Sequence, residues 1–324
     1  MQVIEVARLG GPEVLQAAER PDPVPGAGEV LALVRAAGVN FADVYQRTGY
    51  GRHATPVPFV AGAEGAGRVI ALGPGVAELR VGDRIVWMHV PGSYAERVQV
   101  PVAKAVRIPD GVDDETACAA MLQGVTAQYL AADCYPIRPG DNVLVHAAAG
   151  GVGLLLTQMA RARGARVIAT VSSAEKEALA RTAGAQDVIR YDRDAVAPAV
   201  RALTGGEGVM AVYDGVGAAT FEDSLASLRV RGCLVLFGNA SGPVPPFDLA
   251  RLAACGSIYI TRPTAVHYTR THAELAARAG EVLESVLSGR LRVRVGARYR
   301  LAEAAAAHAA LEGRQTTGKV LLLP

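Results

Sequence analysis

The stretch Val-Leu-Val-His-Ala-Ala-Ala-Gly-Gly-Val-Gly at residues 143–153 decides the fold of this chain. Its first five residues form a short apolar run that is typical of a buried parallel strand. The glycines at 150, 151 and 153 predict a tight turn, and apolar residues at helical spacing after them predict a helix that ends at Gly164. A strand, a glycine turn and a helix in this order can bind a pyrophosphate, because free helix N–H groups point at its charge.

The match to the dinucleotide-binding fingerprint is imperfect, because Ala148 stands where the first glycine is usual. A tight structural turn is the alternative interpretation. The context favours a nucleotide, since residues 124–262 alternate strands and helices as βαβ units require. Six strands are expected, at 143–147, 166–171, 187–191, 209–214, 233–237 and 257–260. This pattern predicts an α/β fold with a doubly wound parallel sheet.

The two ends of the chain have a different pattern. Residues 1–123 contain short strand-like runs separated by Gly and Pro turns, which predicts a compact barrel-like domain. An apolar helix expected at 117–130 leads into the second domain. Residues 263–324 return to the first style and are expected to complete the first domain. Their predicted elements are helices at 274–288 and 302–311 and strands at 291–295 and 320–323.

Composition bounds the possible functions. The chain has 324 residues, of which 51% are hydrophobic and 20% charged, and its formal net charge of +2 gives no support to nucleic-acid or anionic-membrane binding. Neither a signal peptide nor a membrane span is expected. Four widely spaced cysteines fit reduced thiols in a cytoplasmic protein. No metal is expected, because no histidine or cysteine pair has zinc spacing, and no Gly-x-Ser-x-Gly hydrolase motif occurs.

The choice of dinucleotide depends on the end of the second predicted strand. An NAD site has an acidic residue there, whereas this chain has Ser172, followed by Ser173 and Lys176. A hydroxyl and a lysine can bind a 2′-phosphate that an acid would repel, so the pattern predicts NADPH. In the alternative interpretation a serine caps the next helix and Lys176 is solvated, and both can hold together. Tyr191, after the third strand, could pack beside the adenosine or simply fill the rim.

Two further polar residues attract interest. His146 lies in the first predicted strand and is interpreted as a satisfied core histidine. Asn40 follows an apolar strand of the first domain, where it could form a turn or bond a ligand carbonyl or the nicotinamide ribose. Tyr45 follows it within two helical turns.

Seven motifs together resemble the zeta-crystallin type of NADPH:quinone oxidoreductase, in the medium-chain dehydrogenase/reductase superfamily. They are GGPEVL at 10–15, GVNFAD at 38–43, QGVTA at 123–127, HAAAGGVG at 146–153, YDGVG at 213–217, FGN at 237–239 and TRP at 261–263. The resemblance runs almost from end to end. Zinc-dependent members carry Gly-His-Glu where this chain has Gly62-Ala63-Glu64, so the resemblance is to the zinc-free branch.

The resemblance implies a GroES-like catalytic domain made of residues 1–123 and 263–324 around a Rossmann domain at 124–262. It also implies a set of NADPH-binding residues, to which the turn and strand-end patterns add Gly150 and Ser173. The full set is Phe41, Ala42, Asp43, Val44, Tyr45, Tyr129, Gly150, Gly151, Val152, Ser172, Ser173, Lys176, Tyr191, Val216, Gly238, Asn239, Ala240, Ser241, Thr264, Ala265, Val266 and Arg314.

A quinone is a strong electrophile, so it needs orientation and hydrogen bonding as charge develops, rather than a metal ion. Asn40, Tyr45, Gln123 and Thr126 are the expected catalytic residues, with the proton coming from solvent or Tyr45. Two alternatives remain open. One is NADPH-dependent reduction of an activated C=C bond in an alkenal, enone or enoyl thioester. The other is an NADPH-binding protein with little turnover.

The last expectation concerns assembly. Residues 257–260 form a short apolar strand at the end of the predicted sheet, with no lysine or proline inside it. An open edge of that kind invites pairing with another chain, so a two-fold homodimer is predicted. The family resemblance points the same way. In the alternative, the loop at 243–246 or the helix from 274 covers the edge within one chain.

Overall fold

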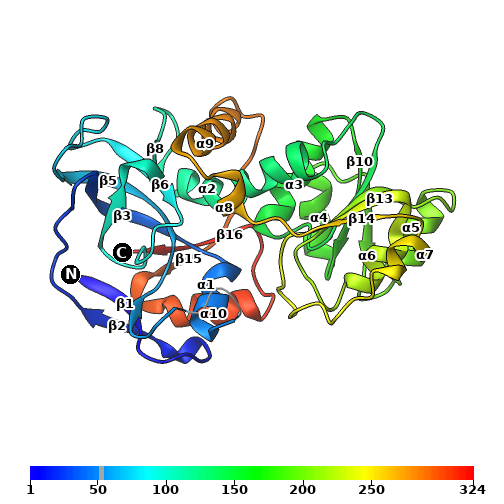
Figure 1. Cartoon of the computed structure of the whole chain (residues 1–324), viewed down its shortest axis with the longest axis horizontal. Coiled ribbons are helices and arrows are strands. Elements are labelled where there is room, and N and C mark those ends of the chain that lie inside the picture. The colour runs from blue at the N-terminus through cyan, green and yellow to red at the C-terminus, as the bar shows by residue number, and fades with distance from the viewer. Residues whose placement is uncertain (51–54) are drawn as a thin grey trace. The chain divides into compact units, whose positions relative to one another are not determined.

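The computed structural model describes residues 1–50 and 55–324, and it divides into two compact units (Figure 1). Unit 1 comprises Met1–Val125 and Thr269–Pro324, and unit 2 comprises Thr126–Tyr268. The sequence places the domain boundaries at 123/124 and 262/263, whereas the units change at 125/126 and 268/269. The boundary between the units at 125/126 lies inside the helix α2 (Asp114–Tyr129).

Unit 2 is a doubly wound α/β sheet, which confirms the expected fold class. Its six strands are all parallel and lie in the order β11-β10-β9-β12-β13-β14. Their bounds are β9 (Asn142–Val145), β10 (Arg166–Val171), β11 (Asp187–Arg190), β12 (Val209–Asp214), β13 (Leu228–Leu236) and β14 (Tyr259–Thr261). The strand order reverses beside β9, and open sheets bind ligands at such a switch point.

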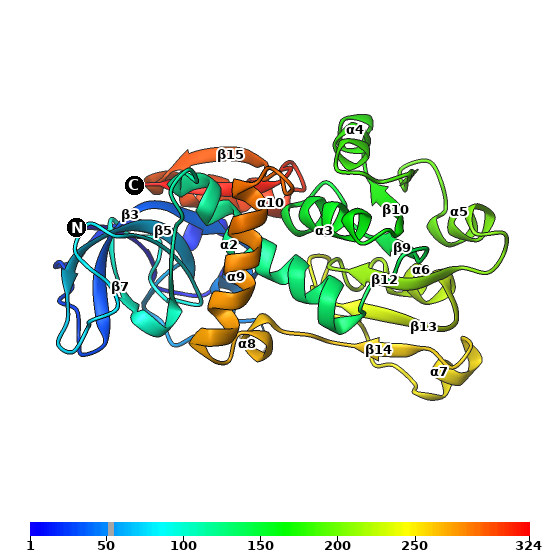
Figure 2. The ribbon, with the colours of Figure 1, turned by 90° about the horizontal axis from the view of Figure 1, so that it is seen from above.

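Helices cover both faces of this sheet (Figure 2). The helices α3 (Gly151–Ala162) and α4 (Ala174–Thr182) contact each other, and so do α5 (Val196–Leu203) and α6 (Phe221–Ser227). Right-handed crossovers place the two pairs on opposite faces. Two short helices follow, α7 (Ala250–Ala254) and α8 (Ala265–Tyr268).

Two strands of unit 2 differ from their expected bounds. The strand β13 begins at Leu228 rather than 233, because its first part is an irregular extension in which the register with β12 shifts and Arg231 has a φ of 59°. The edge strand β14 covers Tyr259–Thr261 rather than 257–260. Ile258 precedes it and is buried as a member of the core cluster to which the sheet, α5 and α6 contribute.

Unit 1 is built around a seven-stranded sheet with a smaller three-stranded sheet beside it. The main sheet has the order β15-β16-β3-β5-β6-β8, with β7 also paired to β3, and the small one has the order β2-β1-β4. The strand bounds are β1 (Gln2–Val6), β2 (Leu15–Glu19), β3 (Glu29–Val39), β4 (Phe59–Val60), β5 (Glu64–Leu72), β6 (Arg84–Met88), β7 (Arg97–Pro101), β8 (Ala105–Arg107), β15 (Val295–Arg300) and β16 (Lys319–Leu323).

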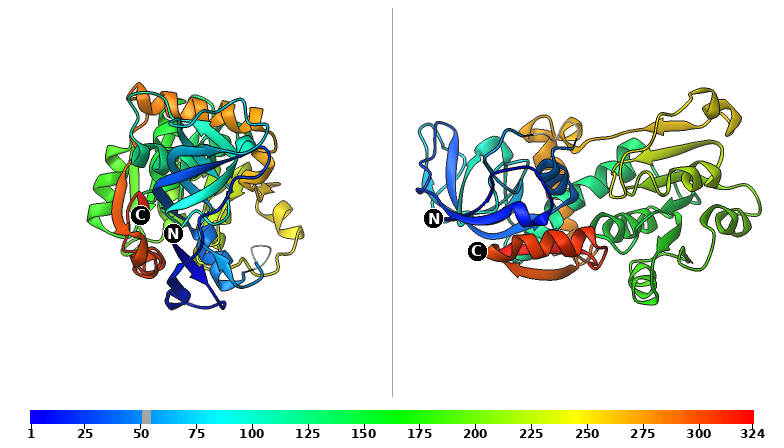
Figure 3. Two further views of the ribbon diagram at one scale, coloured as in Figure 1. Left: turned by 90° about the vertical axis from the view of Figure 1, so that its left-hand side faces the viewer. Right: turned by 90° about the horizontal axis from the view of Figure 1, so that it is seen from below.

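The last strand returns to the first half of the chain. β16 lies antiparallel to β3, with Val320 opposite Val39, so Lys319 comes level with Asn40. The strand expected at 291–295 is wrong, because the chain begins to pair with β16 only at Val295, opposite Lys319. The helices of this unit are α1 (Phe41–Thr48), α2, α9 (His272–Leu287) and α10 (Ala304–Glu312). α10, red in Figure 3, contacts β15 and β16.

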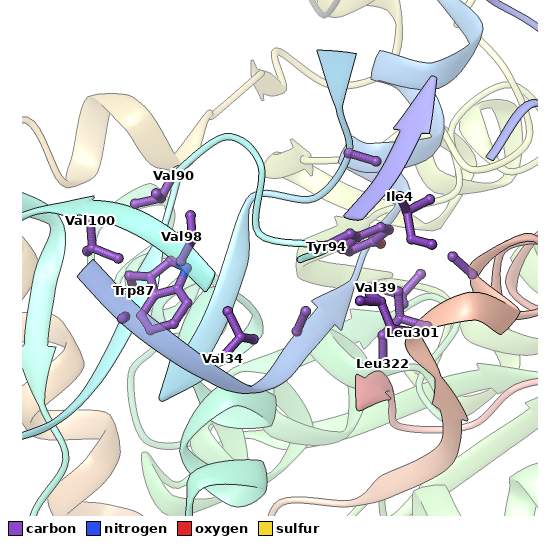
Figure 4. Packing of buried hydrophobic residues seen from close by; sticks show 14 of the residues in the cluster. Ile4, Val34, Val39, Trp87, Val90, Tyr94, Val98, Val100, Leu301 and Leu322 are labelled. Carbon is purple, nitrogen blue, oxygen red and sulfur yellow. The ribbon is translucent and has the colours of Figure 1, made fainter. Parts of the chain in front are cut away.

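The core of unit 1 is formed by buried side chains from both of its sheets and from α10. Trp87 and Tyr94 are its largest members, and both are fully buried. Figure 4 shows the Trp87 ring beside Val34 and Val98, and the Tyr94 ring beside Ile4. The strands β3 and β5 approach so closely at Gly67 that a side chain there would collide with the carbonyl group of Leu33. The Tyr94 hydroxyl points out of this apolar core and donates a hydrogen bond to Asp43 on α1.

Candidate functional site

The glycine turn lies at the carboxyl end of β9, in the middle of the unit 2 sheet. Backbone bonds from both neighbouring strands brace it: His146 N donates to Tyr213 O, and Ala148 N donates to Thr170 O, each at 3.1 Å. His146 is therefore the first residue after the strand, and not in the middle of it as expected. Ala147 has a φ of 49°, the left-handed region, which begins the turn.

The helix α3 begins directly from this turn. Gly150 is its N-cap, and no side chain among the described residues caps it, so its first N–H groups remain available to an anion. At Gly153 a side chain would come within 2.5 Å of Ala147 O, so only glycine lets the helix start this close to the strand. The turn thus has the geometry expected of a pyrophosphate site.

A second loop follows β12 and is held by Asp214. Its Oδ1 accepts hydrogen bonds from Val216 N at 2.8 Å and Gly217 N at 3.0 Å. Ser241, in the loop after β13, donates both its N–H and its hydroxyl to Val216 O, each at 2.8 Å. The expected cofactor residues Gly150–Val152, Val216 and Gly238–Ser241 therefore all follow the carboxyl ends of β9, β12 and β13, the edge where such sheets bind ligands.

The end of β10 carries the two serines. Ser173 is the N-cap of α4, where its hydroxyl accepts from Lys176 N at 3.2 Å. The ammonium of Lys176 folds back and donates to the Ser172 hydroxyl at 3.2 Å. Ser173 therefore caps α4, as the alternative interpretation expects, and Ser172 and Lys176 lie within hydrogen-bond distance of each other. Tyr191 follows β11 beside them, with its N–H bonded to Val171 O and its side chain 43% exposed.

The remaining expected cofactor residues of unit 2 lie near its last helix. The buried Tyr129 ring stacks on Tyr268 of α8, with centroids 4.3 Å apart and planes 6° apart. Thr264 precedes α8, and Ala265 and Val266 begin it. Thr126, expected to be catalytic, is 8% exposed on α2.

In unit 1, Asn40 lies between two buried charges. Its Nδ2 donates to Glu64 Oε2 at 2.8 Å and to Gly38 O at 3.2 Å, and its Oδ1 accepts from Lys319 Nζ at 2.8 Å. Lys319 also forms a close ion pair with Glu64, and the two side chains are 1% and 0% exposed. Glu64 Oε1 accepts from Leu122 N at 2.6 Å. Both amide hydrogens of Asn40 are thus already donated within the unit.

A chain of hydrogen bonds continues from Asn40 into α1 and α10. Asn40 N donates to Asp43 Oδ2 at 2.9 Å, and Tyr94 OH donates to the same oxygen at 3.1 Å. Burial raises the pKa of Asp43 to about 7, against the opposing effects of the Asn40 N–H and the Lys319 charge. Tyr94 OH also lies 3.1 Å from His308 Nε2.

His308 extends this chain of hydrogen bonds from Tyr94 to Arg47. Burial, reinforced by the Arg47 charge, lowers the pKa of His308 to about 3, so its ring is neutral. Arg47 can only donate to His308 Nδ1, at 3.4 Å, so Nε2 carries the hydrogen and donates to Tyr94. Arg47 itself is 1% exposed and pairs with Glu312 at 2.8 Å.

Three half-buried aromatic rings lie along α1 and just beyond its end. The Tyr45 ring centroid lies 6.2 Å from that of Phe41 and 5.5 Å from that of Tyr50. On α2, the buried Oε1 of Gln123 has no hydrogen-bond partner among the described residues. Arg314, by contrast, is exposed beyond the end of α10.

Sequence reasoning missed the Glu64–Lys319 ion pair and the side-chain partners of His146. One signal for the pair is in the composition: only three of the 33 basic residues are lysines, and Lys319 stands in an apolar strand. In residues 1–50 and 55–324, no group of three His, Cys, Asp or Glu side chains could hold a metal ion. No helix in this described part has the length and apolar character needed to cross a bilayer.

Two family models match the chain. The alcohol dehydrogenase GroES-like domain matches residues 26–110, and the zinc-binding dehydrogenase domain matches residues 151–278. Among curated relatives, a quinone oxidoreductase of Pseudomonas aeruginosa is 46% identical over 99% of both chains. A 2-haloacrylate reductase of a Burkholderia species is 40% identical over 98% of both.

The chain is also similar to solved structures over its full length. A mycobacterial protein complexed with NADPH is 52% identical, with a TM-score of 0.97 and full coverage of both chains. The quinone oxidoreductase of Escherichia coli complexed with NADPH is 40% identical, also with a TM-score of 0.97 and full coverage.

The ion pair in unit 1 leads to a stability prediction. Lys319→Met would leave Glu64 buried without its counter-charge, which we expect to lower the free energy of unfolding by about 3–5 kcal/mol. The double variant Glu64→Gln/Lys319→Met should recover part of this loss. Urea unfolding measures both, with Lys104→Met as the control at less than ~0.5 kcal/mol. Equal losses for Lys319→Met and Lys104→Met would contradict the role of the pair.

Proposed function

The chain belongs to the quinone oxidoreductase family of medium-chain dehydrogenases/reductases, and from this membership we propose that it reduces quinones with NADPH by hydride transfer, without a metal ion. The observation that supports NADPH as the cofactor is the contact between Ser172 and Lys176 at the end of β10. A hydroxyl and an ammonium 3.2 Å apart, with no acid in the position usual for NAD, fit a 2′-phosphate. Two related structures are NADPH complexes, which supports the same choice.

NADPH supplies the hydride when bound, and the residues of unit 2 hold it in place. The N–H groups at the start of α3 bind the pyrophosphate, and the loops at 215–217 and 238–241 line the same edge of the sheet. Tyr191, which is 43% exposed after β11, would cover the adenosine end. The quinone takes up one hydride and one proton and becomes the hydroquinone, so the protein must orient the ring and supply or admit a proton.

We assign the acceptor-binding roles to residues of unit 1 and α2. Tyr45, with Phe41 and Tyr50 beside it, offers aromatic surface to a planar ring and a hydroxyl to its oxygen. Gln123 offers a donor such as the hydroquinone O–H a carbonyl oxygen that has no partner in residues 1–50 and 55–324, and Thr126 offers a hydroxyl. Asn40 has both amide hydrogens committed to Gly38 and Glu64, so we give it the role of positioning α1.

Reduction of an activated C=C bond is the second candidate, because a 2-haloacrylate reductase covers 98% of this chain at 40% identity. That reaction also begins with hydride transfer but must protonate carbon, which would place more demand on Tyr45. The two activities use the same nucleotide site and differ in the acceptor.

An acceptor panel separates the candidates. We expect NADPH oxidation with simple quinones at a kcat/KM at least about tenfold above that with enones and haloacrylates, because a quinone needs orientation but no placed acid. Tyr45→Phe should lower the activity with enones more than that with quinones. A higher kcat/KM for enones would favour C=C reduction. Tight NADPH binding without oxidation by any acceptor would indicate a binding protein instead.

The cofactor preference has its own test. Lys176→Ala should weaken NADPH binding about ten- to a hundredfold and leave NADH binding within about twofold, because a charge-assisted contact to the 2′-phosphate contributes about 1.5–3 kcal/mol. Fluorescence titration with each nucleotide measures both constants. Lys104→Ala serves as the matched control in unit 1. Equal losses for NADPH and NADH would show that Lys176 does not bind the 2′-phosphate.

We further propose that the protein works in the cytoplasm as a homodimer of the zinc-free, zeta-crystallin-type branch. None of its four cysteines forms a disulfide within the described part of the chain, which fits a reducing compartment. The strand β14 is at the edge of the unit 2 sheet, and Tyr259 on it is 65% exposed. An exposed edge of this kind can be continued by the same edge of a second copy across a two-fold axis.

Sedimentation at micromolar concentration tests the dimer. We expect a dimer for the natural sequence and a monomer for Tyr259→Lys, because the added charge would be buried at the edge. Val81→Lys is the control, since Val81 is also apolar and exposed but lies in unit 1. A monomeric natural protein would rule out the dimer, and a dimer that survives Tyr259→Lys would place the interface elsewhere.

A further inference from the structure

A buried row of four polar side chains runs beneath the carboxyl ends of three strands in unit 2. Thr170 is on β10, His146 follows β9, Ser224 is on α6 and Asp214 ends β12. His146 Nδ1 lies 3.0 Å from Thr170 Oγ1, and its Nε2 lies 3.1 Å from Ser224 Oγ. Ser224 in turn donates to Asp214 Oδ2 at 2.7 Å. Each of the four is at most 2% exposed.

The direction of the hydrogen bonds in this row can be assigned. The one hydrogen of the Ser224 hydroxyl goes to Asp214, so Ser224 can only accept from His146. Burial lowers the pKa of His146, so its ring is neutral and carries one hydrogen, on Nε2. Nδ1 is then an acceptor, and Thr170 donates to it. This arrangement places one hydrogen in each of the three contacts of the row.

The row joins two loops that have no polar side chains of their own. Residues 147–151 are three alanines and two glycines, so no polar side chain within the turn can anchor it. His146 is the nearest residue with a polar side chain before it. At the other end, the loop 215–217 reads Gly-Val-Gly and is held by Asp214 Oδ1, while Oδ2 of the same carboxylate receives Ser224. Ordering a glycine-rich backbone is entropically costly, so loops like these need hydrogen bonds from neighbouring residues to hold them in one conformation.

We propose that His146 and Ser224 are positioning residues for the nucleotide, which lock the turn at 147–150 to the loop at 215–217 and thereby set the affinity for NADPH. This inference rests on the proposed function, because both loops carry residues assigned to the cofactor. It assigns no contact between His146 and the nucleotide. The effect passes through the backbone of the two loops, so it should change nucleotide affinity and leave the acceptor step intact.

Isosteric variants test the row. Ser224→Ala removes the link between His146 and Asp214, and Thr170→Val removes the donor to His146 Nδ1. We expect each variant to raise the Kd and the KM for NADPH about tenfold, on the scale of one lost buried hydrogen bond, with kcat at saturating NADPH within about twofold. Fluorescence titration and steady-state kinetics give these values.

The chain supplies matched controls in the same unit. Ser227 on α6 and Thr157 on α3 are fully buried, and their hydroxyls have no hydrogen-bond partner among the described residues. Ser227→Ala and Thr157→Val remove the same groups as the test variants without breaking a bond, so NADPH affinity should stay within about twofold. Test variants that bind NADPH as tightly as these controls would overturn the inference while leaving the proposed function intact.

A spectroscopic measurement checks the proton assignment independently of activity. Nitrogen-15 NMR of the full-length protein should show His146 as the neutral Nε2–H tautomer, with its signals identified by their loss in His146→Gln. An Nδ1–H tautomer or a charged ring at neutral pH would overturn the row as described. If the natural protein binds no NADPH at all, the proposed function fails and the inference fails with it.

Discussion

The structure of unit 1 depends on the ion pair between Glu64 and Lys319. The two residues are 255 positions apart, and neither charge would be stable by itself at 0% and 1% exposure. Asn40 and the Leu122 N–H supply the remaining hydrogen bonds, so both charges are satisfied. A side chain at Gly38 would occupy the space of the pair, which explains why glycine stands near the end of the apolar strand β3. The pair thus ties the last strand of the chain to β5 and to the start of α1.

Each unit contains a neutral buried histidine that transmits hydrogen bonds toward a carboxylate. In unit 1 the row runs from Arg47 through His308 and Tyr94 to Asp43, which accepts from the N–H of Asn40 at the start of α1. In unit 2 it runs from Thr170 through His146 and Ser224 to Asp214, which holds the loop after β12. In both cases the carboxylate bonds backbone N–H groups of a segment that has a proposed functional role. Buried polar rows of this kind specify one conformation, because a half-satisfied row is costly.

The sequence predicted much of unit 2 and less of unit 1, for a physical reason. Parallel strands buried on both faces are continuous apolar runs, so β10 and β12 have the bounds read from the sequence. The α/β class and the relation to quinone oxidoreductases are confirmed. In unit 1 the strands β2, β4 and β8 are short or polar, and β15 takes its register from β16, which no local pattern records. The partners of Lys319 and His146 depend likewise on segments far apart in the chain, and local spacing carries no information on them.

The use of lysine in this chain follows from the geometry of its buried and strand-end sites. Arginine supplies almost all of the basic residues, and its planar guanidinium suits the surface pairs such as Arg181–Glu177. Lys319 must fit between a carboxylate and an amide oxygen at close range, where a compact ammonium with three donors can bond both. Lys176 must turn back over one helical turn to reach Ser172, which its flexible stem allows. Exchange of either lysine for arginine is therefore not conservative, although the charge is the same.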